Sequence, residues 1–308
     1  MHHLLSLEGY TRAQLTKLLD AAESWLRAPD EPVARSDELA GRTVTNLFFE
    51  PSTRTRVSFE LAAKRLGADI VNLDLVTSSR QKGESVLDTV YTLQAMQTDI
   101  FVVRDSEERT QRDIAEHVAP QVGVINAGEA HLAHPTQGLL DVLTIRQHKP
   151  EIEDLTVTIV GDIAHSRVAR STARALRILG NRSLRLVGPE QFLPEADEFP
   201  EAELTTDLDA ALDGADVVMA LRLQKERMDT GKLSHTINYA GKYCITNQRL
   251  KHARPDAIVM HPGPLNRDVE ISSDIADGRQ SVIFEQVRNG VAVRMAVLVA
   301  MNKTLTNA

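Results

Sequence analysis

"FFEPSTRTRVSFE" (residues 48–60) joins a strand-like apolar run to a helix-like run, and this junction decides how the fold is interpreted. Ser52 stands where a helix N-cap belongs. The start of a helix carries partial positive charge and unsatisfied N–H groups, so it favours acidic residues. This helix instead begins with Arg54 and Arg56. The mismatch suggests that an anion binds there and offsets the repulsion.

Free N–H groups, a planar guanidinium and the nearby hydroxyls of Ser52, Thr53 and Thr55 suit a phosphate group. Residues two apart on a helix point about 200° apart, so only one of the two arginines can face the ligand. Arg54 is nearer the turn and is the better candidate. The alternative is a surface helix with solvated arginines. The motif is not a Walker A loop, because no G-x-x-x-x-G-K-[ST] pattern is present.

Apolar strand-like runs recur along the chain and alternate with amphipathic helical stretches. They begin at residues 43, 68, 99, 122, 155, 183, 216 and 256. This alternation predicts an α/β fold with two doubly wound domains, each with a central, mostly parallel sheet flanked by helices. Gly67 and Gly180 are expected to end two of the helices, and Glu60 and Lys64 to pair across one turn. In the helix after Ser52, Val57, Leu61 and Ala62 are expected to lie on one apolar face.

The composition narrows the class of protein. The chain has 308 residues and a formal net charge of −8, so nucleic acid and anionic membranes are not expected partners. Cys244 is the one cysteine, which fits a reducing, cytoplasmic setting. No apolar run reaches the roughly 18 residues of a membrane span, and the N-terminus, with His2 and His3, is interpreted as frayed rather than as a signal peptide or metal site.

Polar side chains follow several other predicted strands, where open α/β sheets bind ligands. Arg104 ends one strand, and His134 follows another and is placed before a helix whose first residue is Pro135. Arg167 and Arg222 follow two strands of the second half. Arginines converging in an acidic protein indicate a small substrate with several negative charges. For a lone histidine the competing interpretation is a structural role, and for the loop 76–85 it is a solvated, exposed segment.

Other chemistries are disfavoured. The turn "VGDIAHSR" (160–167) has one glycine where a dinucleotide-binding turn needs three. No zinc spacing, Ser-His-Asp pattern or nucleophile elbow is found, so no metal or cofactor is expected. The turn "HPGPL" (261–265) contains two prolines without N–H groups, so its carbonyls suit a substrate amide. The predicted chemistry is therefore positioning and charge stabilisation.

Six motifs together resemble the catalytic chain of the aspartate carbamoyltransferases, within the aspartate/ornithine carbamoyltransferase superfamily. They are "FFEPSTRTRVSFE", "QKGES", "HPTQGLLD", "GDIAHSR", "RLQKER" and "HPGPLNRDVEI", in that order. Two features favour the aspartate members over the ornithine members. Lys82 is typical of the aspartate members. The ornithine members have an H-C-L-P motif, whereas residues 261–264 of this chain read H-P-G-P. Gly263 stands where some members have Leu or Ala.

The resemblance implies transfer of a carbamoyl group from carbamoyl phosphate to L-aspartate, in de novo pyrimidine biosynthesis. Residues 1–135 plus 288–308 would form the carbamoyl-phosphate-binding domain and residues 136–287 the aspartate-binding domain. The implied carbamoyl-phosphate ligands are Ser52, Thr53, Arg54, Thr55, Ser78, Arg104, His134, Gln137, Gly263 and Pro264. Thr55, Arg104 and His134 would be catalytic, and Lys82, Arg167, Arg222 and Gln224 would bind aspartate.

The resemblance also implies a homotrimer with shared active sites, in which Ser78 and Lys82 come from a neighbouring subunit. Glu50, Arg167 and Arg227 match residues that bridge the two domains when they close. A regulatory chain or another pyrimidine-pathway subunit is a further possible partner. Two alternatives stay open: a carbamoyltransferase for ornithine or a related amine, and a phosphate- or ligand-sensing module with a similar two-domain architecture.

Overall fold

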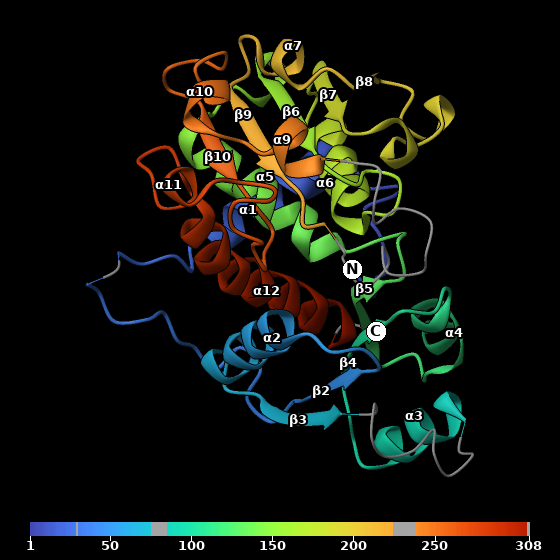
Figure 1. The fold of residues 1–308 in the computed structure, drawn as a ribbon. Helices are drawn as coiled ribbons and strands as arrows, with labels where there is room; N and C mark the ends of the chain where they lie inside the picture. The colour runs from blue at the N-terminus through green and yellow to red at the C-terminus, as the bar shows by residue number, and fades with distance from the viewer. Residues whose placement is uncertain (29, 75–84, 224–237, 307–308) are drawn as a thin grey trace. The chain divides into compact units, whose positions relative to one another are not determined.

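The structure is a computed structural model that describes residues 1–28, 30–74, 85–223 and 238–306 (Figure 1). The chain divides into two compact units. The first comprises Met1–Leu140 and Arg288–Ala308, and the second comprises Asp141–Val287. The division falls inside two helices, α5 (Pro135–His148) and α12 (Ile283–Leu305).

The first unit contains a five-stranded sheet in the order β1-β5-β4-β2-β3, and every neighbouring pair is parallel. Its strands are β1 (His3–Leu4), β2 (Thr43–Phe48), β3 (Asp69–Asp74), β4 (Ile100–Asp105) and β5 (Gly123–Glu129). β4 is buried along almost its whole length, as expected for a parallel strand covered on both faces. The carboxyl ends of β5, β4 and β2 therefore lie next to one another at one edge of the sheet.

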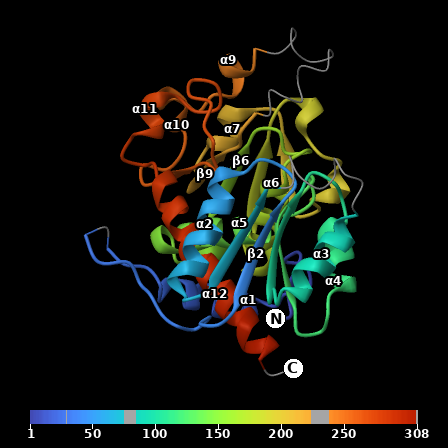
Figure 2. The ribbon, with the colours of Figure 1, turned by 90° about the horizontal axis from the view of Figure 1, so that it is seen from below.

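Helices cover both faces of this sheet. They are α1 (Arg12–Glu23), α2 (Thr53–Arg65), α3 (Val86–Ala95), α4 (Thr110–His117) and parts of α5 and α12. Figure 2 shows α2 and α12 on one side of β2 and α3 and α4 on the other. On the α3 and α4 side, Val90 and Ile114 pack with Phe101 of β4 in one apolar cluster. On the other side, the guanidinium of Arg294 stacks over the ring of Phe59 at 5.0 Å.

Helix α2 begins and ends where the sequence predicted. Ser52 is its N-cap, and Gly67 follows its C-terminus with φ +80°, a conformation that glycine adopts without steric cost. Lys64 and Glu60 form the expected ion pair, 2.6 Å apart. The pKa of Glu60 is lowered, chiefly by the Lys64 hydrogen bond, with a smaller contribution from Arg56.

The buried face of α2 differs from the expected one. The sequence placed Val57, Leu61 and Ala62 on one apolar face. In the structure, Ala62 is buried with Phe59, whereas Val57 and Leu61 are 42% and 39% exposed. The expectation was wrong because α2 has apolar residues on two of its faces. Which of these faces is buried depends on how the helix packs against the sheet.

The second unit contains another five-stranded parallel sheet, in the order β10-β9-β6-β7-β8. Its strands are β6 (Thr156–Val160), β7 (Ser183–Val187), β8 (Ala202–Thr205), β9 (Val217–Ala220) and β10 (Ile258–Met260). Its helices are α6 (Arg167–Ile178), α7 (Leu208–Leu212), α9 (Tyr239–Tyr243), α10 (Asn247–Leu250) and α11 (Ser273–Ala276), with 3-10 turns η2 (Ile152–Asp154), η3 (Glu190–Phe192) and η4 (Ala196–Glu198). The order again places the carboxyl ends of β10, β9 and β6 side by side.

These findings confirm the predicted α/β class with two parallel sheets flanked by helices. Gly180 has φ +89° just after α6, as expected for a helix end. Two strands were not predicted. His3–Leu4 forms β1 beside β5 instead of a frayed terminus, and Ala202–Thr205 forms the edge strand β8. Both strands are too short to show a periodic pattern in the sequence.

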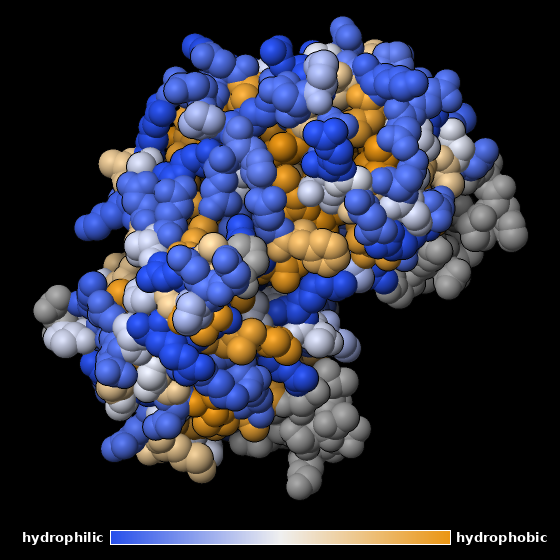
Figure 3. All heavy atoms as spheres, turned by 90° about the vertical axis from the view of Figure 1, so that its left-hand side faces the viewer, coloured by the Kyte–Doolittle hydropathy of each residue, from blue (hydrophilic) through white to orange (hydrophobic). Residues whose placement is uncertain are grey.

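The surface is mixed in character. On the face drawn in Figure 3, hydrophilic side chains alternate with small groups of hydrophobic ones.

None of the helices in the described part of the chain has the length and apolar character needed to cross a membrane.

Candidate active site

The start of α2 has the features of an anion site. The side chain of its N-cap, Ser52, makes no capping hydrogen bond, and the first turn contains no acidic residue. Arg54 is exposed, whereas Thr55 is 7% exposed and lies against the protein interior. The first N–H groups of a helix have no partner within the helix, so this turn combines free donors with an arginine at the positive end of the dipole.

Arg104 lies next to this turn. It is on β4, directly opposite Phe48 at the end of β2. Its Nε is 2.7 Å from Oε1 of Glu50, and its Nη1 donates to the carbonyl of Ala127 at 3.1 Å. The Arg104 and Glu50 side chains are 12% and 22% exposed, so this pair is partly screened from water. Glu50 and Ala127 therefore hold the guanidinium in one orientation at the edge of the sheet.

His134 and Gln137 complete the group in the first unit. Helix α5 begins at Pro135, as predicted, and the carbonyl of His134 accepts the N–H groups of Gln137 and Gly138. His134 and Gln137 are 4% and 8% exposed, which restricts their side chains to few orientations.

Strand order brings these segments together. Residues 52–55 follow β2, Arg104 lies at the end of β4, and His134 follows β5, and these three strands are neighbours in the sheet. The carboxyl ends of parallel strands are the usual ligand site of open α/β sheets. The arrangement offers cationic and N–H donors for a phosphate, and a histidine beside them for a polarised oxygen.

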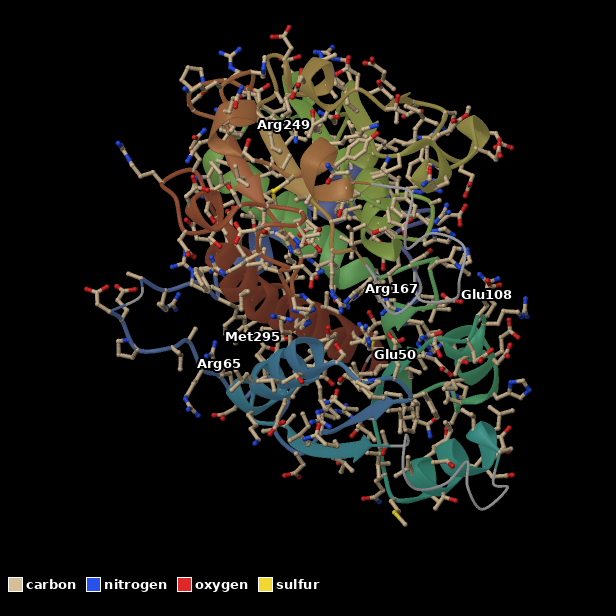
Figure 4. All side chains as sticks on the ribbon, in the orientation of Figure 1. Glu50, Arg65, Glu108, Arg167, Arg249 and Met295 are labelled. Atoms are coloured by element: carbon tan, nitrogen blue, oxygen red, sulfur yellow. The ribbon has the colours of Figure 1, made fainter. Side chains whose placement is uncertain are left out.

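The second unit repeats this arrangement with two further arginines. Arg167 is the first residue of α6 (Figure 4). The N-cap of this helix, Ser166, accepts the N–H of Ala169 at 3.1 Å. Arg222 follows β9, the strand beside β6. Arg167 and Arg222 are both partly buried and follow adjacent strands, and guanidinium groups are chemically suited to carboxylates.

The predicted Pro-Gly-Pro turn follows β10, the next strand in the same sheet. Gly263 has φ +67°, in the left-handed region that favours glycine, and its N–H donates to Nδ1 of His261 at 2.8 Å. The two flanking prolines donate no backbone N–H. The turn can therefore offer a ligand carbonyl oxygens rather than backbone N–H donors.

Glu270 is a residue that the sequence analysis did not single out. It is 0% exposed, and its Oε1 accepts from the N–H of Leu223 at 2.8 Å and from Nδ2 of Asn266 at 2.6 Å. Its Oε2 accepts the N–H of Asn266 at 2.9 Å. Burial raises the pKa of Glu270 by more than these hydrogen bonds lower it. The carboxylate ties the segment after β9, which carries Arg222, to the turn after β10.

Glu270 lies within the motif "HPGPLNRDVEI", but the motif assigned it no role, because its contact with Leu223, 47 residues away along the chain, forms only in the fold. Four predicted residues, Ser78, Lys82, Gln224 and Arg227, lie outside the described residues. Within the described residues no group of three or more His, Cys, Asp or Glu side chains is placed to hold a metal ion. The donors at both strand edges are mainly arginines and hydroxyls, which suit anions rather than cations.

Comparison with known proteins identifies the family. Residues 2–147 match the carbamoyl-P binding domain of the aspartate/ornithine carbamoyltransferases, and residues 153–301 match their Asp/Orn binding domain.

Solved structures of both kinds of enzyme are similar to this chain. Ornithine carbamoyltransferase from Thermus thermophilus is 27% identical with a TM-score of 0.86, covering 98% of this chain and 99% of its own. Aspartate transcarbamoylase from Trypanosoma cruzi, in complex with carbamoyl aspartate and phosphate, is 32% identical with a TM-score of 0.85, covering 97% and 94%. The same enzyme in complex with N-(phosphonacetyl)-L-aspartic acid is 31% identical, covering 97% and 94%, with a TM-score of 0.83. The chain belongs to the aspartate/ornithine carbamoyltransferase family.

Proposed function

We propose that the protein transfers the carbamoyl group of carbamoyl phosphate to the amino group of L-aspartate, giving N-carbamoyl-L-aspartate and phosphate in pyrimidine biosynthesis. The lone pair of the amine attacks the carbamoyl carbon, the C–O bond to phosphate breaks, and a proton passes from the amine to the departing phosphate. No covalent enzyme intermediate is needed, so catalysis comes from positioning and charge stabilisation.

The observation that carries the choice of aspartate is the pair Arg167 and Arg222, which follow the adjacent strands β6 and β9. Aspartate has two carboxylates, and each can accept a bidentate hydrogen bond from one guanidinium. Ornithine has one carboxylate and a cationic side chain, which two arginines would repel. Lys82, although it lies outside the described residues, would add a third cation for the same substrate.

In this proposal, most of the groups for carbamoyl phosphate come from the first unit. Residues 52–55 would bind the phosphate that leaves, and Arg54 would gain interaction energy as its charge increases. Thr55, Arg104 and His134 donate to the carbamoyl oxygen, where negative charge develops when the amine attacks. Gln137, together with the carbonyls of Gly263 and Pro264, would hold the carbamoyl NH₂ group, since carbonyl oxygens accept its two N–H bonds.

Ornithine as the acceptor is the second candidate, and the Thermus thermophilus similarity favours it. That ornithine enzyme covers 98% of this chain at a TM-score of 0.86, so the fold alone does not separate the two. The discriminating experiment incubates the protein with carbamoyl phosphate and either aspartate or ornithine and quantifies each carbamoylated product. Product with aspartate supports the proposal. Product with ornithine alone contradicts it, and binding of carbamoyl phosphate without turnover would favour a ligand-sensing module.

We further propose that residues 1–135 with 288–308 form the carbamoyl-phosphate domain and residues 136–287 the aspartate domain. The active form is proposed to be a homotrimer in which Ser78 and Lys82 complete a neighbour's site. A regulatory or other pathway subunit is a possible additional partner. The native mass of the purified protein tests the trimer, because a monomer of 34.0 kDa at working concentration would contradict it.

A further inference from the structure

A continuous series of hydrogen bonds leads from α6 to the turn at Gly263, entirely within the second unit. Thr172 of α6 donates to Oδ2 of Asp141 in α5 at 2.7 Å. Nε2 of Gln286 in α12 donates to Oδ1 of Asp141 at 2.9 Å, and Oε1 of Gln286 accepts the N–H of His261 at 2.9 Å. The Nδ1 of His261 then accepts the N–H of Gly263 at 2.8 Å.

Every side chain in this series is removed from water. Asp141 and Thr172 are 0% exposed, His261 is 1% exposed and Gln286 is 2% exposed. A buried carboxylate is tolerated only when hydrogen bonds satisfy it, and buried polar groups that are fully connected specify one geometry. The series is therefore a rigid support rather than a set of interchangeable surface contacts.

Gln286 is the central member because it uses both ends of its amide. A carboxamide can donate to a carboxylate and accept a backbone N–H at the same time, which no apolar, acidic or basic side chain of that length does. His261 is held in a defined state as well. Since its Nδ1 accepts from Gly263, the ring proton of the neutral imidazole is on Nε2. Two consecutive hydrogen bonds, from His261 to Gln286 and from Gly263 to His261, thus connect the turn after β10 to Gln286.

We propose that Gln286, anchored by Asp141, is a positioning residue for the carbonyls of the Gly263–Pro264 turn. The inference rests on the proposed function, in which these carbonyls hold the carbamoyl NH₂ group. Gln286 itself would not touch the substrate. It fixes the position of His261, and His261 fixes the backbone of Gly263.

The decisive variant is Gln286→Met, which keeps the length of the side chain and removes both hydrogen bonds. A small displacement of a group that orients the substrate can cost about 10²-fold in rate, so we expect kcat/KM for carbamoyl phosphate to fall by roughly 10- to 100-fold. Much of that fall should be an increase in KM for carbamoyl phosphate. A purely structural role would lower the active fraction, and hence kcat, with KM unchanged.

A matched control is Gln280→Met in the same unit. Its Nε2 donates to the carbonyl of Ala257 at 2.9 Å, and this bond is not part of the series. The control should retain the wild-type KM for carbamoyl phosphate. If Gln286→Met does not fold, Thr172→Val removes the first bond of the series without changing the shape of the side chain. It should raise the same KM by a smaller factor, and Thr172→Ser, which keeps the hydroxyl, should restore it.

Hydrogen exchange separates this inference from the proposed function. In Gln286→Met, or in Thr172→Val if the first variant does not fold, the amides of His261 and Gly263 should exchange faster than in wild type, whether or not the protein transfers carbamoyl groups. An inactive wild-type protein would refute the function but leave this measurement valid. Unchanged exchange at both amides, or a folded variant with the wild-type KM for carbamoyl phosphate, would overturn the inference.

Discussion

Substitution of Gly161 by alanine should destabilise the second unit through a clash with Leu221, the residue before Arg222 of the proposed aspartate site. Gly161 follows β6 and has φ +145°, a conformation that other residues rarely adopt. A Cβ atom there would lie 2.8 Å from Cβ of Leu221 and 3.3 Å from its carbonyl oxygen. Leu221 cannot easily retreat, because its N–H donates to the carbonyl of Val160 at 2.8 Å.

The expected magnitude follows from two separate costs. Holding alanine at this φ costs about 1–3 kcal/mol, and overpacking a buried contact costs about 1–3 kcal/mol more. Alanine also lowers the conformational entropy of the unfolded chain, and this effect stabilises the folded state by about 0.4–1 kcal/mol. We therefore expect the free energy of unfolding to fall by roughly 1–5.6 kcal/mol, and the middle of this range, about 3 kcal/mol, would lower the urea midpoint by about 1 M or more.

Gly214→Ala is the matched control, since Gly214 has φ +66° but no heavy atom within 4 Å of the added Cβ. It should cost about 1 kcal/mol, from the backbone conformation alone. Urea unfolding followed by circular dichroism measures both variants. In the folded fraction, displacement of Leu221 should also raise the KM for aspartate, because Arg222 is the next residue. Equal midpoints for the two variants would refute the steric argument.

Four further predictions follow from individual residues. Arg54→Ala should lower turnover by about 10²-fold or more, as for loss of one transition-state donor, and near-normal steady-state kinetics would show a solvated surface arginine instead. Inactive Arg54→Ala and Lys82→Ala chains should regain activity when mixed into hybrid oligomers, and no recovery after confirmed mixing would place each site within one chain. Burial raises the pKa of Cys244 to about 11, so its alkylation at pH 8 should be much slower than in urea-unfolded protein, and equal rates would contradict its burial. Because the pKa of Glu270 is raised, its contribution to stability is fully present below about pH 4.5 and is lost as the pH rises through its folded-state pKa. In Glu270→Gln the free energy of unfolding, measured by urea titration at a series of pH values, should lack this decrease. The same pH dependence in the variant and the wild type would refute the shift.

Much of the fold was accessible from the sequence because its signals are local. The stretch at residues 48–60 marked the end of β2 and the N-cap Ser52, and both were confirmed. The start of α5 at Pro135 and the glycine after α6 were also found, since caps and helix ends depend on a few consecutive residues. The inward face of α2 was assigned wrongly, because the surface against which a helix packs is not encoded within the helix itself.

The candidate site divides in the same way. Residue type and position after a strand singled out Arg54, Arg104 and His134, and their roles in catalysis remain predictions. The sequence could not show that β5, β4 and β2 are adjacent, which is what places these residues at one edge. The sequence also assigned no role to Glu270, although this residue lies in the last family motif, because its contact with Leu223 arises only in the folded unit.

The sequence by itself determined the order of most strands and helices, the family motifs and the unusual arginine at the start of α2, because each depends on neighbouring residues. The tertiary structure decided which strand ends meet, and which distant side chains support the turn at Gly263. Thr172 lies 31 residues along the chain from its partner Asp141, and Gln286 lies 145 residues from Asp141. Such contacts form only when packing has excluded water and closed long loops, so no pattern of neighbouring residues in the sequence predicts them.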